Sequence, residues 1–288
     1  MRSVLALDRV KYLNDRMAED YGWVPDGVDI TVPDASRVYD YALGGFHNFQ
    51  VDREFAEEAQ RAWPGIYQLA HANRAYLGRA VQWLVEHGVR QFLDIGSGIP
   101  TLGNVHEVAQ AAVPDARVVY VDIDPVAVAH SRHILAGNPG ASAISGDLRR
   151  PADILGHPEV LDLLDFSEPV ALLLMAVLHF VPDDEDPGGV IRAFDEVTVS
   201  GSYVALSHGI PAEVRAAEQD QVRSLYRRTP TSVHLRTPER VVALLDGWTV
   251  VEPGLVPITD WWPDPEDEEP HQPEVIAVVA RKDARDRP

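Results

Sequence analysis

Cysteine is absent from this sequence, and basic residues are scarce: 25 Lys and Arg stand against 45 Asp and Glu, a formal net charge of −20. Without cysteine the chain can form no disulfide bond, no zinc site built on thiolates and no cysteine nucleophile. Because basic side chains supply most of the affinity for nucleic acid, so acidic a protein is not expected to bind it. The eleven histidines show no metal-ligand spacing, so no metal site is expected either.

Long hydrophobic runs are lacking as well. The longest apolar stretch, residues 170–181, is shorter than the ~20 residues that a membrane helix needs, and it contains His179. It is better interpreted as a buried central strand and its exit. The N-terminus has only a short apolar run before Asp8 and Arg9, which is not a secretory signal. We therefore expect a soluble cytoplasmic protein with no membrane partner.

The chain is organised around residues 90–101, RQFLDIGSGIPT. An apolar run that ends at Ile95 stops abruptly at Gly96-Ser97-Gly98, which predicts a buried strand, a tight glycine turn and the start of a helix. In doubly wound α/β folds such a turn is a ligand-binding site. Taken alone, the pattern is equally consistent with a sharp connection that binds nothing.

A second apolar strand, VVYVD, ends in Asp122, 24 residues after Gly98. This interval is close to the ~20 residues expected between a glycine turn and a carboxylate that binds a ribose. An NAD site would have a third glycine at the position of Thr101. A nucleoside ligand without a pyrophosphate therefore fits better, and an NAD-dependent oxidoreductase is the weaker alternative.

Four motifs together resemble the cofactor motifs of class I S-adenosylmethionine-dependent methyltransferases: DIGSG (94–98), VVYVD (118–122), SGDLR (145–149) and PVALLLMAVLHF (169–180). More narrowly, residues 33–280 resemble an actinobacterial methyltransferase family long labelled as of unknown function. The segments that carry this second resemblance are SRVYDYALGGFHNFQVDRE, NRAYLGRAV, GNVHEVAQ, PDARVVYVDIDP and LSHG. The broad class often has a glycine where this chain has Pro100, whereas the narrower family accepts proline there.

The resemblance implies a Rossmann-like α/β fold: a mostly parallel seven-stranded sheet with helices on both faces and an antiparallel last strand, plus an N-terminal helical extension. The alternation of apolar patterns agrees with a parallel sheet. Beyond the glycine turn it predicts helices over residues 101–112, 125–136, 151–164, 187–199, 211–228 and 238–245, and strands over residues 117–122, 141–145, 169–175, 202–207, 247–252 and 274–281. Residues 260–273 are too acidic and proline-rich for regular structure.

The N-terminal extension is longer than the sheet needs for stability. Helices are predicted over residues 5–21, from Pro33 to the Gly44-Gly45 break, and over residues 51–63 and 66–86. We interpret residues 1–88 as a lid over the strand ends and residues 89–288 as the cofactor-binding domain. Packing on a sheet edge or on a partner subunit is the alternative, so a homo-oligomer is left open.

The resemblance implies S-adenosylmethionine as the cofactor and assigns its contacts. Aspartates after strands are also common helix caps and turn formers, which is the alternative for Asp122 and Asp147. Arg74 could pair with the cofactor carboxylate, and Asn48 or Asn73 could hold its ammonium group, unless they only bond the lid to the sheet. The other assignments are Asp94, Gly96 and Gly98 beside the methionine portion, Asp122 on the ribose hydroxyls, and Asp147 on the adenine amino group with Leu148 against the ring. Met175 or Ala176, at the exit of the fourth strand, and Ile123 are also assigned to the cofactor.

The acceptor side offers fewer signals. Tyr39, Tyr41 and His47 are candidates for substrate contacts, since their segment should meet the strand ends. His179 and His208 follow strands and are the candidate general bases if the acceptor is a hydroxyl group. Either histidine could instead be structural. The predicted function is methyl transfer to a small molecule by in-line displacement, and the alternative is a protein that binds the cofactor without transferring its methyl group.

Overall fold

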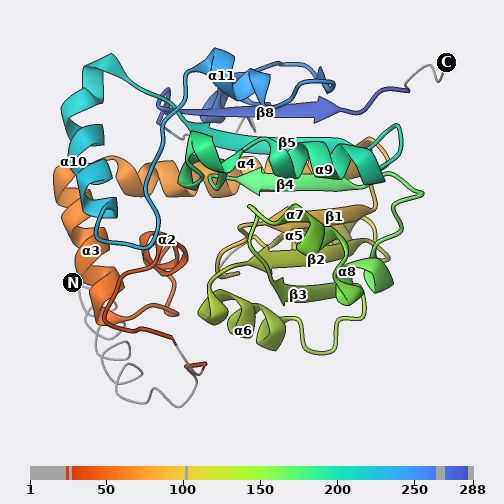
Figure 1. Ribbon diagram of the computed structural model, residues 1–288, viewed down its shortest axis with the longest axis horizontal. Coiled ribbons are helices and arrows are strands. Elements are labelled where there is room, and N and C mark those ends of the chain that lie inside the picture. Colours follow the sequence, from red (N-terminus) through yellow and green to blue (C-terminus); the bar gives the residue numbers. More distant parts are fainter. Residues whose placement is uncertain (1–23, 26–27, 101–102, 264–269, 285–288) are drawn as a thin grey trace, which may run out of the picture.

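The structure is a computed structural model that describes residues 24–25, 28–100, 103–263 and 270–284. Its centre is a mixed sheet with the strand order β3-β2-β1-β4-β5-β8-β6, in which β7 also pairs with β8 (Figure 1). The strands are β1 Gln91–Ile95, β2 Arg117–Asp122, β3 Ala141–Ser145, β4 Ala171–Met175, β5 Tyr203–Gly209, β6 Thr249–Val250, β7 Val256–Pro257 and β8 Val275–Arg281. The Rossmann-like fold class is confirmed, with β7 as one strand more than expected.

Strands β1 to β5 run parallel, and β8 lies antiparallel to β5 and to β6. The central strands are buried on both faces, as continuous apolar runs predict. Successive residues point to opposite faces, so Phe92 packs in one core cluster and Leu93 in the other. The last strand, β8, is antiparallel, which confirms the prediction for the end of the sheet.

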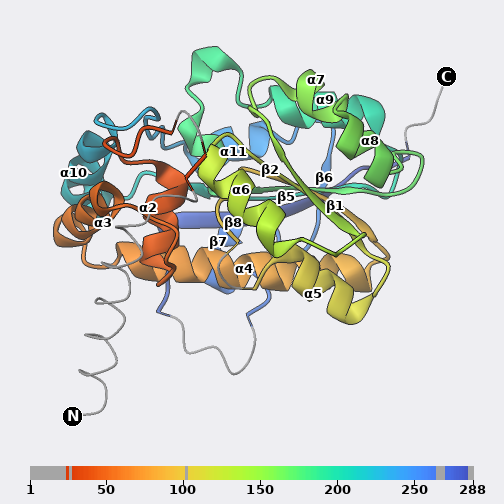
Figure 2. The same cartoon turned by 90° about the horizontal axis from the view of Figure 1, so that it is seen from below.

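Helices cover both faces of the sheet (Figure 2). The face of Phe92 is covered by α4 and α5, while α7, α8, α9 and α11 cover the face of Leu93. The helices are α2 Ala35–Ala42, α3 Gln50–Ala62, α4 Ile66–Glu86, α5 Val105–Ala112, α6 Pro125–Ile134, α7 Pro151–Leu155, α8 Pro158–Leu163, α9 Gly189–Val197, α10 Ala216–Tyr226 and α11 Pro238–Ala243. Among the described residues, no helix combines the length and apolar character that a membrane crossing requires.

Several predicted boundaries are wrong for local reasons. The helix after the glycine turn begins at Val105 rather than 101, because Gly103 adopts φ +60° and Asn104 is the N-cap residue. The helix expected over 151–164 is two helices, since the chain turns at Gly156 and Pro158 starts the second one. The strand expected over 247–252 pairs only at Thr249–Val250. The helix expected over 5–21 lies outside the described residues.

A helical cap lies beyond the carboxyl ends of the parallel strands and is formed by α2, α3, the start of α4, and α10 (Figure 1). The sequence did not indicate that α10 joins it. The Tyr226 ring of α10 lies 5.1 Å from the Phe55 ring of α3, nearly perpendicular to it. Arg228 pairs with Glu58 at 2.5 Å. The cap is therefore assembled from two distant parts of the chain.

Candidate active site

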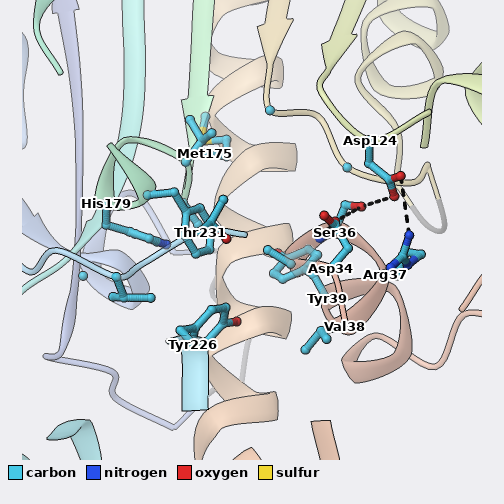
Figure 3. Close-up of a pocket in the computed structure, with 18 of the residues that line it drawn as sticks. Asp34, Ser36, Arg37, Val38, Tyr39, Asp124, Met175, His179, Tyr226 and Thr231 are labelled. Carbon is cyan, nitrogen blue, oxygen red and sulfur yellow. Dashed lines mark hydrogen bonds and ion pairs between the residues drawn. The ribbon is translucent and has the colours of Figure 1, made fainter. Parts of the chain in front are cut away.

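A cavity of about 740 Å³ lies between the cap and the carboxyl ends of β1, β2 and β4. Figure 3 shows Asp34, Ser36, Arg37 and Asp124 on one side of it, and Met175, His179, Tyr226 and Thr231 on the other. We call the first side the acidic end and define it by Asp34, Asp94, Asp122, Asp124 and Asp147. The other side is the aromatic end, defined by Ala56, Tyr67, His179, Phe180 and Tyr226.

The glycine turn after β1 lines the acidic end. Gly96 and Gly98 adopt φ values of +72° and +65°, which side chains rarely allow. A Cβ atom on Gly96 would also lie 2.3 Å from Cγ2 of Val177, whereas one on Gly98 would meet nothing within 4 Å. Packing and backbone conformation therefore require glycine at 96, and the space beside Gly98 is open to a ligand.

Asp122 at the end of β2 holds this turn in place. Its Oδ2 accepts a hydrogen bond from Gly98 N at 2.7 Å, and its Oδ1 accepts one from Asp124 N at 2.9 Å. Burial raises the pKa of Asp122 to about 7. The side chain thus forms the turn, which was the alternative to a ribose contact, but each carboxylate oxygen keeps a second lone pair that can accept from a ligand hydroxyl.

Arg74 and Asp94 face the cavity next to the turn. Burial raises the pKa of Asp94 to about 7, an effect that the nearby Arg74 charge reduces. The Arg74 guanidinium lies 5.9 Å from the centre of the Tyr39 ring. Its Nε is buried and has no hydrogen-bond partner among the described residues. A buried donor of this kind fits a carboxylate ligand.

A chain of hydrogen bonds joins the cap to the exit of β4. Tyr39 Oη donates to Ala70 O (3.0 Å) and accepts from Asn73 Nδ2 (2.9 Å). Ser207 Oγ donates to Asn73 Oδ1 (2.5 Å) and accepts from Ala176 N (2.9 Å). Ala176 adopts φ +51°, an unfavourable conformation for alanine that this bond supports. Tyr39, Asn73 and Ala176 all line the cavity, as does Met175.

Asp147 reaches the cavity after β3 but is already paired. Arg149 donates from Nε to Oδ1 (2.9 Å) and from Nη2 to Oδ2 (2.7 Å) of this carboxylate. These bonds hold the pKa of Asp147 below its usual range. The Asp147 side chain is 24% exposed. Leu148 and the half-exposed Ile123 also line the cavity at this end.

A further contact, which the sequence analysis missed, ties the cap to the acidic end. Ser36 Oγ lies 2.8 Å from Asp34 Oδ1 and 2.7 Å from Asp124 Oδ2. Arg37 is buried, donates to Asp52 Oδ2 at 3.0 Å and lies 3.7 Å from Asp124 Oδ1. The Asp124-Pro125 pair, a helix N-cap signal, could have pointed to this position.

Four predicted site residues do not line the cavity: Tyr41, His47, Asn48 and His208. Asn48 Nδ2 and His47 N donate to Asp40 Oδ2 at 2.8 and 2.9 Å, because the turn after α2 wraps around the buried Asp40 carboxylate. The His47 ring contacts that of His130. Tyr41 Oη donates to Glu57 Oε1 at 3.3 Å.

His208 lies behind the cavity wall, fully buried. Its Nδ1 lies 2.7 Å from Gly209 O, so Nδ1 carries the hydrogen and Nε2 accepts from Arg236 Nη1 at 3.1 Å. Burial lowers the pKa of His208 to about 4. The imidazole is therefore neutral, with both nitrogens occupied.

His179 does line the cavity, in a short 3-10 turn after β4. Its Nδ1 is buried and has no hydrogen-bond partner among the described residues. Burial, and then the nearby His208 and Arg236, lower the pKa of His179 to about 3. His179 is thus a neutral imidazole whose Nδ1 has no partner in the described part of the chain.

Arg236, which the sequence did not single out, fixes the segment that carries His179. It is 2% exposed and donates from Nη1 to Leu178 O (2.9 Å), from Nη2 to Val181 O (2.6 Å) and from Nε to Asp183 Oδ1 (3.0 Å). His234 N also donates to His179 O at 2.7 Å. These bonds leave the His179 ring little freedom to move away from the cavity.

Comparison with known proteins gives a family-level match. A family model described as S-adenosyl methyltransferase matches residues 21–283. The structure of a DUF574 family protein from Streptomyces avermitilis is 39% identical, with a TM-score of 0.82; the match covers 88% of this chain and 100% of that one. A candidate methyltransferase from Thermobifida fusca is 38% identical, with a TM-score of 0.83 and coverage of 91% and 99%. No curated protein matches the sequence.

Proposed function

Because this chain belongs to the S-adenosyl methyltransferase family, and is therefore an S-adenosylmethionine-dependent methyltransferase, we propose that it methylates a small molecule bound in the cavity. One observation carries the proposal: a single cavity joins the glycine turn and Asp122 to the aromatic end beneath the cap. Its volume of about 740 Å³ falls in the range of small-molecule sites, ~300–1,000 Å³. A macromolecular acceptor would need a more open surface.

The residues of the acidic end fit the cofactor. When bound, S-adenosylmethionine would supply an electrophilic methyl group, which a nucleophile attacks in line with the carbon–sulfur bond that breaks. The open space beside Gly98 admits the ligand next to the backbone, and Asp122 can accept from the ribose hydroxyls. The unpartnered Arg74 Nε can donate to the carboxylate, and the carboxyl of Asp94 can face the ammonium group.

The remaining tasks of the protein are to orient the acceptor and to exclude water. His179 Nδ1 can accept a hydrogen bond from an acceptor hydroxyl and orient it, since the ring is neutral. His208 is left without a catalytic role because both of its nitrogens are bonded. A cytoplasmic location and a homo-oligomer stay predictions from the sequence.

Calorimetry with S-adenosylmethionine, S-adenosylhomocysteine and NAD tests the cofactor side of the proposal. The first two ligands should bind and NAD should not. Methyl transfer from labelled S-adenosylmethionine to small compounds of a cell extract tests the reaction, with the His179→Gln variant as the comparison. Binding without any transfer would favour the cofactor-binding protein without activity.

The proposal includes the cap as a lid on a cofactor-binding domain of residues 89–288. Residues 1–88 form the main part of this lid, and of these, 1–23 and 26–27 lie outside the described residues. The Ser36–Asp124 contact and the Tyr39–Asn73–Ser207 bonds support it, because they link α2 and α4 to the strand ends. S-adenosylhomocysteine should slow hydrogen exchange in residues 36–50 and 70–78 more than in the strands. Unchanged exchange there would make the cap a packing element.

A further inference from the structure

The charges around the aromatic end are already paired. Arg223 pairs with Asp220 at 3.2 Å, and Glu274 pairs with Arg215 at 2.7 Å. Among the described residues that line this end, no charged side chain is left without an opposite charge, since Arg74 lies toward the acidic end. A carboxylate or phosphate on the acceptor would therefore enter the cavity without a counter-ion, which is unfavourable.

The walls of the aromatic end are formed by aromatic rings that pack against neighbouring rings. The Tyr226 ring lies between those of Phe55, at 5.1 Å, and Phe180, at 5.7 Å. Tyr67 lies 6.4 Å from Tyr41, edge to face, and packs in the same cluster as Tyr226. Each ring is fixed by a neighbour, so the ring faces and edges are preorganised. Flat aromatic ligands gain most from such walls.

Two polar groups interrupt these apolar walls. Among the described residues, His179 Nδ1 has no hydrogen-bond partner, and Tyr226 Oη makes no hydrogen bond either. In Figure 3 the two side chains lie on the same side of the cavity. Burial raises the pKa of Tyr226 to about 12, so its hydroxyl stays protonated and can donate or accept. A ligand with one or two hydroxyl groups would satisfy both groups.

We propose that the acceptor is an uncharged, planar aromatic compound with a hydroxyl group, bound against Tyr226 and Phe180 with that hydroxyl toward His179. This inference rests on the proposed function. In the transfer, the acceptor oxygen forms a bond to the methyl carbon while the carbon–sulfur bond breaks and leaves its electron pair on sulfur. His179 Nδ1 accepts the hydrogen bond of the acceptor hydroxyl and orients it, and the hydroxyl proton is released to water as the bond to carbon forms. The product is a neutral methyl ether.

Calorimetry on the full chain saturated with S-adenosylhomocysteine tests this class with three probes of similar size. 2-Naphthol is flat and neutral, 2-naphthoate is flat and anionic, and 2-decalol is neutral but saturated. 2-Naphthol should bind at least ~10-fold more tightly than either of the others. Equal or tighter binding of 2-naphthoate would overturn the uncharged class, and equal binding of 2-decalol would overturn the aromatic one. Failure of S-adenosylhomocysteine to bind would instead contradict the proposed function.

A pair of variants locates the probe. Tyr226→Leu removes a wall of the aromatic end and should weaken 2-naphthol binding about 3- to 10-fold. Phe46→Leu makes the same kind of change at a half-exposed ring outside the cavity and should leave it unchanged. Both variants should keep their affinity for S-adenosylhomocysteine, which also shows that they fold. Equal 2-naphthol affinity in Tyr226→Leu and Phe46→Leu would remove Tyr226 from the acceptor site.

Discussion

The acidic end and the aromatic end of the cavity are built by different interactions. At the acidic end, Asp122 and Asp124 bind backbone amides of turns that follow neighbouring strands, so the geometry is set within a few residues of each strand. At the aromatic end, rings from α3, α4, α10 and the segment after β4 pack on one another. Cofactor affinity should therefore depend on the hydrogen bonds of the acidic end, whereas the choice of acceptor should depend on side-chain packing at the aromatic end.

The largest effect is expected behind the aromatic end, in Arg236→Met. This change leaves the buried Val181 carbonyl without its Arg236 donor and the Leu178 carbonyl with only Val181 N, and it removes the ion pair of the buried guanidinium, so the free energy of unfolding should fall by ~2–5 kcal/mol. Urea denaturation measures it. Arg240→Met is the matched control, because this arginine also pairs with Asp183 but is 57% exposed; its effect should stay within ~0.5 kcal/mol. An equal decrease in the free energy of unfolding in the two variants would show that Arg236 does not fix the segment that carries His179.

Next comes Asp122→Ala at the acidic end. Loss of the ribose contact and of the bond to Gly98 N should cost ~1.5–3 kcal/mol of cofactor binding, about 10- to 150-fold in affinity. Calorimetry with S-adenosylhomocysteine measures it, with the exposed Asp162→Ala as control. Binding of 2-naphthol to the saturated protein should change much less. An equal loss for both ligands would contradict the division of the cavity into two ends.

The two ends should also show opposite pH dependence of stability. Burial raises the pKa of Asp94 from 3.8 to about 7, so the folded chain holds a proton that the unfolded chain releases, and this contribution to stability is lost as the pH rises through 7. Burial lowers the pKa of His179 from 6.5 to about 3, so its contribution is present above pH 6.5 and is lost as the pH falls toward 3.

Urea denaturation between pH 4.5 and 6.5 separates these contributions. With rising pH, the unfolding free energy of Asp94→Asn should rise more steeply than that of the parent, by up to ~1.4 kcal/mol per pH unit. That of His179→Gln should rise less steeply, by up to a similar amount. Slopes that change in the same direction would show that one of the two groups does not titrate as its burial requires.

The acidic end could be predicted from the sequence because its parts are local. A glycine turn and the aspartate of the next strand are recognised from short motifs, and Gly98 and Asp122 both line the cavity, joined by a hydrogen bond. The aromatic end could not be, because the position of Tyr226 depends on how α10 packs on α3. His47 and Asn48 lie outside the cavity for a similar reason. Both donate hydrogen bonds to the buried Asp40 carboxylate, which belongs to no recognisable motif.

The smallest effect is expected for Asp147→Asn, at the rim of the acidic end. The Asp147 carboxylate is 24% exposed and already paired with Arg149, and an asparagine oxygen can still accept from the adenine amino group. Since partly exposed ion pairs are worth ~0–1 kcal/mol, cofactor affinity should fall less than ~5-fold. Arg149→Met, which frees the carboxylate without removing it, should not weaken binding. If Asp147→Asn instead loses as much affinity as Asp122→Ala while circular dichroism shows an intact fold, the charge at 147 is a main contact of the cofactor, and the acidic end extends to β3 in function as well as in position.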